Sequence, residues 1–170
     1  MRRYVIWFGA YLALLYTAAS GAQVGGNLTK YPPNELRLEI TSGENGAPIL
    51  NPQRFEITTG DYYRLTISSD GAGKSPRGGT QSRRFEAPEF LSNVHLRILT
   101  INDIEVHLQS MSFRAIELDE AGEASFTFVP IRVGEFPMTV GPDPLSVKRQ
   151  VGESGFDADS QTALGVIHVK

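Results

Sequence analysis

The segment 123–141 contains two short runs of alternating apolar and polar residues, and these runs constrain the fold more than any other part of the chain. Before Pro130, phenylalanines alternate with serine and threonine, which is the period of two that turns one side of a strand toward a core. In the run after this proline, Phe136, Met138 and Val140 share one side. The segment is therefore predicted to form two strands, paired as a hairpin of a β-sandwich.

Similar alternating runs elsewhere predict the remaining strands of one all-β domain. They are found at 36–40, 55–57, 63–67, 94–99, 104–109, 113–118 and 162–169, with one short helical turn at 87–93. The runs at 55–57 and 63–67 are expected to pair as an early hairpin. No helical stretch is long enough to connect parallel strands, so the expected fold class is a Greek-key β-sandwich over residues 35–170.

These motifs resemble those of the cupredoxins, a family of copper-binding β-sandwiches. The residues SFTFVPIRVGEFPM (125–138) are similar to the last hairpin of that family, and NPQRFEITTGDYYRLTIS (51–68) is similar to an early one. The residues TALGVIHV (162–169) resemble its final strand. The resemblance implies a Greek-key sandwich of the cupredoxin type, similar to plastocyanin and azurin.

The resemblance stops at the copper ligands. In cupredoxins a cysteine follows near the position of Val140, and a histidine and a methionine come from the next loop. This chain has no cysteine, and its loop 141–161 contains neither histidine nor methionine. The weak candidate for a metal ligand is His107, but the strand period places it with Glu105 on the side away from the core. We therefore expect no metal and no other cofactor.

No pattern in the sequence indicates an enzyme. A chain without cysteine has no thiol nucleophile, and none of its serines lies in a G-x-S-x-G motif. Carboxylates such as Glu117 and Asp119 fall at strand ends, where they are ordinarily solvated. Basic and acidic residues are mixed and the net charge is −3, which does not favour nucleic-acid binding. A small-molecule substrate is not indicated either.

Residues 1–22 are predicted to direct the rest of the chain across a membrane. Arg2 and Arg3 precede the uncharged apolar run 4–22, and small residues near its end suit a signal peptidase. The run is also long enough to be a retained transmembrane helix with its N-terminus in the cytoplasm. Both alternatives stay open. In either case residues 23–34 would be a linker, and the domain would lie on the periplasmic side of the inner membrane.

The polar segment 68–87 is the most basic part of the exported chain and is predicted to be a loop. In one interpretation the loop is simply solvated. In the other it binds an acidic surface of a partner, with aromatic residues near its end as apolar anchors. The candidate partner-binding residues are Lys74, Arg77, Arg83, Arg84, Phe85 and Phe90.

Two hypotheses for the function remain. The first is a non-catalytic, copper-free, membrane-anchored accessory subunit of a larger membrane complex, whose other subunits would be its partners. By analogy with the family, the host would be a bioenergetic complex, such as a respiratory or photosynthetic reaction-centre complex. The second is a soluble periplasmic copper-binding or electron-transfer protein with an unrecognised site. The missing cysteine and the candidate anchor favour the first hypothesis.

Overall fold

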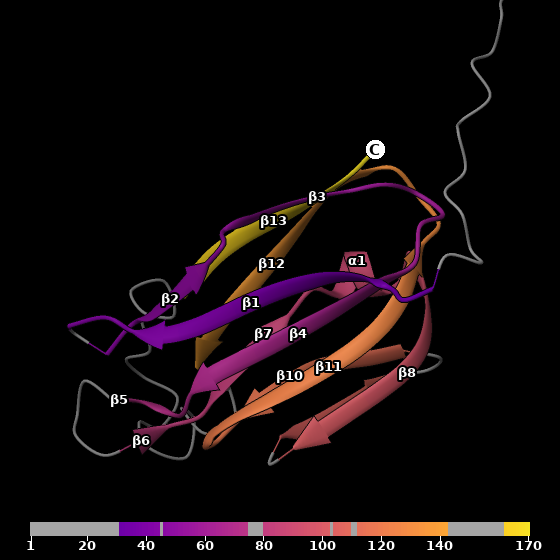
Figure 1. Cartoon of the computed structure of the whole chain (residues 1–170). Coiled ribbons are helices and arrows are strands. Elements are labelled where there is room, and N and C mark those ends of the chain that lie inside the picture. Colours follow the sequence, from indigo (N-terminus) through magenta and orange to yellow (C-terminus); the bar gives the residue numbers. More distant parts are fainter. Residues whose placement is uncertain (1–30, 45, 75–79, 103, 110–111, 143–161) are drawn as a thin grey trace, which may run out of the picture.

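Two β-sheets pack face to face and form the body of the protein (Figure 1). The computed structural model describes residues 31–44, 46–74, 80–102, 104–109, 112–142 and 162–170. Sheet A has the strand order β2 (Pro48–Asn51), β1 (Asn34–Ser42), β4 (Tyr63–Asp70), β11 (Ala121–Pro130) and β8 (Val94–Asn102). Sheet B has the order β3 (Arg54–Ile57), β13 (Ala163–Val169), β12 (Gly134–Pro142), β7 (Arg83–Glu86), β10 (Ser112–Leu118) and β9 (Glu105–Gln109). A short pair, β5 (Gly73–Lys74) with β6 (Thr80–Gln81), and a short helix, α1 (Pro88–Leu91), complete the described elements.

The chain passes repeatedly from one sheet to the other. Strands β1 and β2 lie in sheet A, β3 in sheet B, β4 in sheet A, β7 in sheet B and β8 in sheet A. Most described pairs are antiparallel, and β1 with β4 and β3 with β13 are parallel. The predicted all-β, two-sheet architecture is confirmed. The apolar helix expected before the domain falls outside the described residues, and within those residues no helix is long and apolar enough to cross a bilayer.

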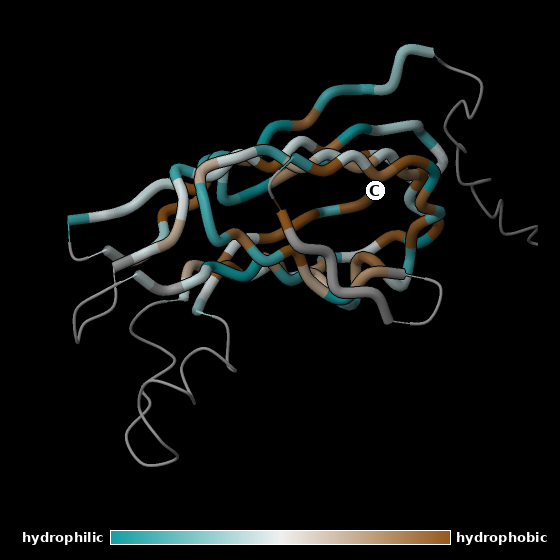
Figure 2. Tube along the Cα trace, turned by 90° about the horizontal axis from the view of Figure 1, so that it is seen from below, coloured by the Kyte–Doolittle hydropathy of each residue, from teal (hydrophilic) through white to brown (hydrophobic). Residues whose placement is uncertain are grey.

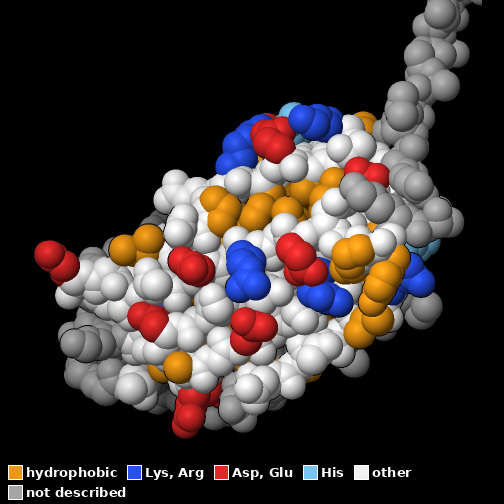
Figure 3. Space-filling view, viewed as in Figure 1, with side chains coloured by type: hydrophobic (Ala, Val, Ile, Leu, Met, Phe, Trp, Pro, Cys, Tyr) orange, Lys and Arg blue, Asp and Glu red, His pale blue; other side chains and the backbone are white. Residues whose placement is uncertain are grey.

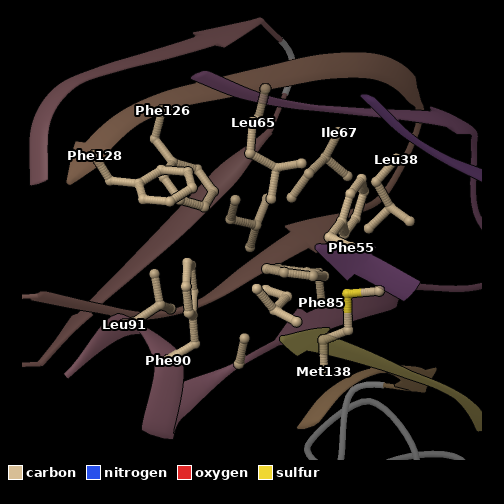
Figure 4. Packing of buried hydrophobic residues seen from close by; sticks show 14 of the residues in the cluster. Leu38, Phe55, Leu65, Ile67, Phe85, Phe90, Leu91, Phe126, Phe128 and Met138 are labelled. Atoms are coloured by element: carbon tan, nitrogen blue, oxygen red, sulfur yellow. The ribbon is translucent and has the colours of Figure 1, made fainter. Parts of the chain in front are cut away.

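The core consists of the inward-facing residues of the two sheets. Figure 2 shows the hydrophobic positions concentrated between the layers, and Figure 4 shows Phe126 and Phe128 pointing toward Phe90 across the interior. Phe126 and Phe128 are each 1% exposed, and Met138 and Val140 are 0% exposed. The alternation in the sequence therefore predicts the inward side of both β11 and β12 correctly.

The sequence predicts hairpins at 123–141 and 55–67, and both predictions are wrong. Strand β11 lies in sheet A and β12 in sheet B, while β3 lies in sheet B and β4 in sheet A. The chain therefore turns a corner between the sheets at each place. Gly60, with a φ of 80°, makes the first corner possible, and its N–H donates to the carbonyl of Pro130 at the second corner (2.9 Å). Two consecutive strands show the same alternation whether they pair as a hairpin or lie in facing sheets, so alternation alone does not distinguish the two arrangements.

Strand β7 lies where the sequence predicts a polar loop. It runs inside sheet B, between β12 and β10. Its four residues, Arg83-Arg84-Phe85-Glu86, include one hydrophobic side chain, so the strand lacks the apolar alternation that marks a half-buried strand. Phe85 is nevertheless 0% exposed and supplies the inward contact of β7 with the core.

Helix α1 places Phe90 between the two sheets. Pro88 occupies the first turn of this helix, and the side chain of Phe90 is 1% exposed. The ring of Phe90 meets Phe128 of β11 edge to face, with centroids 5.1 Å apart, and Phe136 of β12 at 5.9 Å. This one side chain therefore joins a ring from sheet A to a ring from sheet B.

We predict that Phe90→Ala lowers the free energy of unfolding by about 3–5 kcal/mol, because it leaves a cavity between the rings of Phe128 and Phe136. The matched control is Ile131→Ala, which truncates a side chain that is 50% exposed at the corner after β11. Urea denaturation followed by circular dichroism measures both variants. Similar losses for the two variants would contradict the central position of Phe90.

Candidate partner-binding edge

A buried arginine joins the two sheets at the end of the sandwich where β12 stops. Arg83, at the start of β7, is 2% exposed. Its Nη1 lies 2.5 Å from Oδ1 of Asp70 at the end of β4, and its Nη2 donates to Oγ of Ser42 at 2.6 Å. Gly73 leaves room for the Arg83 side chain, because a Cβ at position 73 would lie only 3.3 Å from Nε of Arg83. This Arg83 cluster, made of Arg83, Asp70 and Ser42, ties β7 of sheet B to β1 and β4 of sheet A.

The Arg83 cluster also keeps Asp70 ionised. Burial by itself would raise the pKa of Asp70, but hydrogen bonds with the hydroxyl and the backbone N–H of Ser42, together with Arg83, outweigh burial and lower that pKa. A lowered native pKa adds stability at pH values above the unfolded pKa of about 4. This contribution is lost as the pH falls through the lower native pKa of Asp70.

Four of the predicted partner-binding side chains lie in the interior. Arg83 belongs to the cluster above, and Arg84, which is 8% exposed, has its Nε 2.9 Å from Oε1 of Glu86. Phe85 is 0% exposed and Phe90 is 1% exposed. A partner needs accessible side-chain surface, which these residues lack, so the expectation that they bind a partner is corrected. Their burial follows from the strand β7 and the helix α1, which the sequence does not reveal as parts of the core.

The other two predicted partner-binding residues are Lys74 and Arg77. Lys74 belongs to β5, where it is paired with Thr80 of β6, and Arg77 falls outside the described residues. The basic segment therefore includes a two-stranded sheet as well as β7. A role of these two residues in binding a partner stays a prediction.

The three histidines of the chain lie on three different strands. His95 lies on β8 of sheet A, opposite Val129 of β11. His107 lies on β9 of sheet B, opposite Ala115 of β10. On β13, Nδ1 of His168 lies 2.7 Å from Oε2 of Glu56. Strand β13 is separated from β9 within sheet B by β12, β7 and β10. The topology therefore does not bring the histidines together on neighbouring strands.

The residues present do not fit a blue-copper site. Such a site needs a thiolate and convergent imidazoles, and the chain has no cysteine. The side chain of Arg54, and after it His168, lower the pKa of Glu56, so this carboxylate takes part in an exposed ion-pair network. Among the residues that the structure describes, no group of three or more histidine, aspartate or glutamate side chains is arranged to hold a metal ion.

The most unusual surface of the described residues is the outer edge of β8. Ile98, Leu99 and Ile101 are 57%, 37% and 40% exposed. Adjacent residues of a strand point to opposite faces of its sheet, so Ile98 and Leu99 expose apolar surface on both faces of sheet A. Strand β8 pairs with β11 on one side, and no described strand pairs with it on the other. We call Ile98–Asn102 the β8 edge.

The other sheet ends carry features that discourage pairing with a further strand. Strand β2 has only four residues and begins with Pro48, and β3 has four residues that include Arg54 and Glu56. Strand β9 alternates charged and polar residues with apolar ones in its sequence, EVHLQ. Short strands, prolines and charges are the usual means by which proteins protect sheet edges. The β8 edge contains neither a proline nor a charged residue along Ile98–Asn102.

A shallow polar hollow adjoins the β8 edge on the outer face of sheet A. Its volume is about 330 Å³, and its lining includes Arg64, Ser125, Thr127 and Thr100 beside Ile98. Figure 3 shows this face of the molecule with acidic and basic side chains interspersed across it. The mixture of charges offers no concentrated binding site, so the apolar surface of β8 is the distinctive feature of this face.

The sequence contains a weak signal for the β8 edge. The run VHLRILTIN (94–102) departs from strict alternation at the adjacent residues Ile98 and Leu99. A β-bulge causes this departure, because the pairing with β11 shifts by one residue between Thr127 and Phe128. Consecutive apolar residues also occur in strands that are buried on both faces. The position of β8 at the end of its sheet is needed to tell the two cases apart.

Comparison with protein-family models finds no family that matches, and comparison with curated proteins finds no match either. Several solved structures are similar in fold. The multicopper oxidase Fet3p, which functions in iron import, has 13% identity and a TM-score of 0.47, with 84% of this chain and 29% of that chain covered. Auracyanin from the photosynthetic bacterium Roseiflexus castenholzii has 18% identity and a TM-score of 0.41, with 79% and 96% covered.

A cysteine protease inhibitor from Entamoeba histolytica also matches, with 13% identity, a TM-score of 0.35, and 81% of this chain and 99% of that chain covered. This chain spans less than half the length of the multicopper oxidases that it matches. At such low identities and scores, no conclusion about chemistry follows.

We predict that Asp70→Asn lowers the free energy of unfolding at neutral pH by roughly 1–3 kcal/mol, because Arg83 would keep its buried charge without a carboxylate. The difference from the parent protein should shrink as the pH falls from about 4, where Asp70 of the unfolded chain takes up a proton, through the lower native pKa of Asp70. The control is Glu35→Gln, which removes an exposed ion pair with Arg64 (3.0 Å) and should change stability by less than about 0.5 kcal/mol. Urea denaturation at several pH values measures both, and a pH-independent difference for Asp70→Asn would contradict this account.

Proposed function

We propose that the protein is an exported, non-catalytic β-sandwich that binds no copper and serves as an accessory subunit of a larger membrane complex. The observation that carries this proposal is the β8 edge. Ile98, Leu99 and Ile101 expose apolar surface at a sheet end that no described strand pairs, in a stretch, Ile98–Asn102, without proline or charge. Apolar surface of this kind is favourable only when another molecule or segment covers it.

The proposal that copper is absent rests on the donor atoms of the chain. The sequence supplies no thiolate, and its three histidines belong to three strands in two sheets. A cupredoxin-like sandwich without these ligands keeps the scaffold but loses electron transfer. The remaining role of the scaffold is to present a surface, which agrees with an accessory subunit rather than an enzyme.

The proposal that the host is a membrane complex rests on residues 1–22. A positively charged start followed by an uncharged apolar run favours either export or anchoring, and a retained anchor would hold the sandwich close to membrane proteins on the periplasmic side. The likeness in sequence motifs to cupredoxins makes a respiratory or photosynthetic complex our choice of host.

We predict that the purified protein retains no stoichiometric copper after incubation with Cu(I) or Cu(II) and gel filtration, and that it shows no blue absorption band. His107→Ala should leave the metal content unchanged, and His95→Ala serves as the matched control. Metal analysis and visible spectroscopy measure the outcome. Stoichiometric copper that is lost in His107→Ala would instead support the soluble copper-binding or electron-transfer protein.

We predict that the full-length protein stays in the membrane fraction after a carbonate wash and has an intact mass that includes residues 1–22, because the run 4–22 would remain inserted. In mild detergent it should migrate on native gels with a larger complex at a fixed ratio. A soluble chain that starts near Gln23 and migrates alone would contradict the accessory-subunit proposal.

A further inference from the structure

We propose that a hollow beside the corner between β11 and β12 binds the phosphoethanolamine headgroup of a membrane lipid, while Ile131 and Val133 at this corner insert among the lipids. We call it the corner hollow. Its lining comes from α1 and the two residues after that helix, and from residues 132–136. Such binding rests on the membrane location in the proposed function and goes beyond it, because it assigns one end of the sandwich to the bilayer.

The corner lies at the end of the sandwich where the described chain begins, which we call the tether end. Asn34 of β1 and Phe128 of β11 are both in register with Tyr63 of β4. The start of β1 and the end of β11 therefore share one end of sheet A (Figure 1). The N–H of Ile131 donates to the carbonyl of Asn93 (3.0 Å), which joins the corner to the segment after α1.

The tether end stays close to a membrane when the apolar run 4–22 is inserted. Residues 23–30 separate this run from Tyr31, and an extended chain advances at most about 3.5 Å per residue. Tyr31 can therefore lie no farther than about 30 Å from the end of the run. A tether this short corresponds to a local concentration in roughly the millimolar range, so even a weak contact with lipid is populated.

Apolar side chains protrude at the tether end. Tyr31, Ile131 and Val133 are 81%, 50% and 46% exposed. Tyrosine is enriched at membrane–water interfaces, and moving exposed aliphatic surface into lipid is favourable. At the opposite end of β11, the turn from β10 carries the exposed acidic residues Asp119 and Glu120. The two ends of the sandwich therefore differ, and the tether end is the one suited to lipid.

Two opposite charges line the corner hollow without pairing. Arg132 and Glu89 both belong to the lining, and neither side chain forms an ion pair with any residue that the structure describes. The other carboxylate of the lining, Glu135, already has Arg54 as its partner at 3.0 Å. A ligand that carries a phosphate and an ammonium group would give Arg132 and Glu89 partners of opposite charge.

The hollow also offers space and a free acceptor for this ligand. Its volume is about 450 Å³, and its lining includes Phe136, which is 6% exposed. The side-chain amide of Asn93 uses its Nδ2 to donate to the carbonyl of Glu89 (2.7 Å), and no described donor bonds to its oxygen. This oxygen can accept from an ammonium N–H, which phosphoethanolamine has and phosphocholine lacks.

The same residues disfavour a lipid whose headgroup is purely anionic. Its phosphate would meet Arg132, but Glu89 would face the negative surface of the membrane without any cation from the headgroup. Like charges at short range repel each other. A zwitterionic headgroup avoids this repulsion.

The chain has no cysteine, so a single fluorescent label can report which end meets the bilayer. Val133→Cys and the matched control Glu120→Cys each carry one nitrobenzoxadiazole dye on the full chain, reconstituted in vesicles of phosphatidylethanolamine and phosphatidylcholine. The dye at position 133 should emit at shorter wavelength and be quenched by spin-labelled lipid. The dye at position 120 should be quenched by aqueous iodide instead.

Replacing phosphatidylethanolamine by phosphatidylglycerol tests the headgroup, because the exchange removes the ammonium group and keeps the phosphate. Docking, measured by the dye at position 133, should weaken about two- to fivefold, as expected for an exposed ion pair. Glu89→Gln should abolish this lipid preference, and Arg132→Gln should weaken docking to both lipids. Glu123→Gln and Arg37→Gln, at exposed charges of sheet A, are the matched controls and should change neither.

Three results would overturn the proposed docking. Equal quenching of both dyes by iodide would show that the tether end does not meet lipid. Protection of the dye at position 133 from iodide without quenching by spin-labelled lipid would identify a protein as the occupant. A preference for phosphatidylethanolamine that survives Glu89→Gln would show that the hollow does not recognise the ammonium group.

Failure of lipid docking can be told apart from failure of the proposed function. A chain whose dye at position 133 stays in water, but which migrates with a larger membrane complex, rejects lipid docking and keeps the accessory subunit. A chain that docks with the expected lipid preference and migrates alone supports lipid docking and contradicts the accessory subunit.

Discussion

Aromatic packing between the two sheets is the interaction on which the rest of the structure depends. Phe128 and Phe126 of β11 meet Phe90 and Phe113 edge to face, with centroids 5.1 Å apart in each pair. These contacts require β11 to lie in sheet A, while β10 belongs to sheet B and α1 packs against sheet B. A hairpin of β11 with β12 would place both apolar faces on one sheet and leave them without the opposing layer. The chain therefore crosses from one sheet to the other between β11 and β12, because this crossing lets the aromatic side chains of the two sheets pack against each other.

The strands and the inward residues could be predicted from the sequence, but the partners of the strands could not. Alternation identifies β11 and β12 and their buried residues, because the period of two depends only on which side of a strand faces the core. It does not identify β7, whose two arginines look like solvated residues until Asp70, Ser42 and Glu86 are seen beside them. Ion pairing offsets part of the cost of burying these charges, and local sequence patterns do not reveal which carboxylates will lie beside them.

The β8 edge could likewise not be predicted from the sequence alone. The apolar residues Ile98, Leu99 and Ile101 can be read directly from the sequence, where they are indistinguishable from core residues. They become a binding surface only because β8 is the last strand of sheet A among the described elements. Conversely, Phe85 and Phe90 follow a basic segment and look like exposed anchors, but β7 and α1 carry them into the core. Burial depends on sheet order, which local patterns do not encode.

The Arg83 cluster and the β8 edge lie in different parts of the sandwich: the cluster links the two sheets, and the β8 edge is unpaired among the described strands. The cluster ties β1 and β4 to β7, and β4 is separated from β8 by β11 within sheet A. A strand added beyond β8 would extend the sheet laterally and would not disturb these contacts. In a cupredoxin the chemistry lies in the loops at one end of the sandwich, whereas the distinctive surface here is a lateral edge. Backbone pairing at a sheet edge needs no metal ligand, so the proposed binding function does not depend on copper.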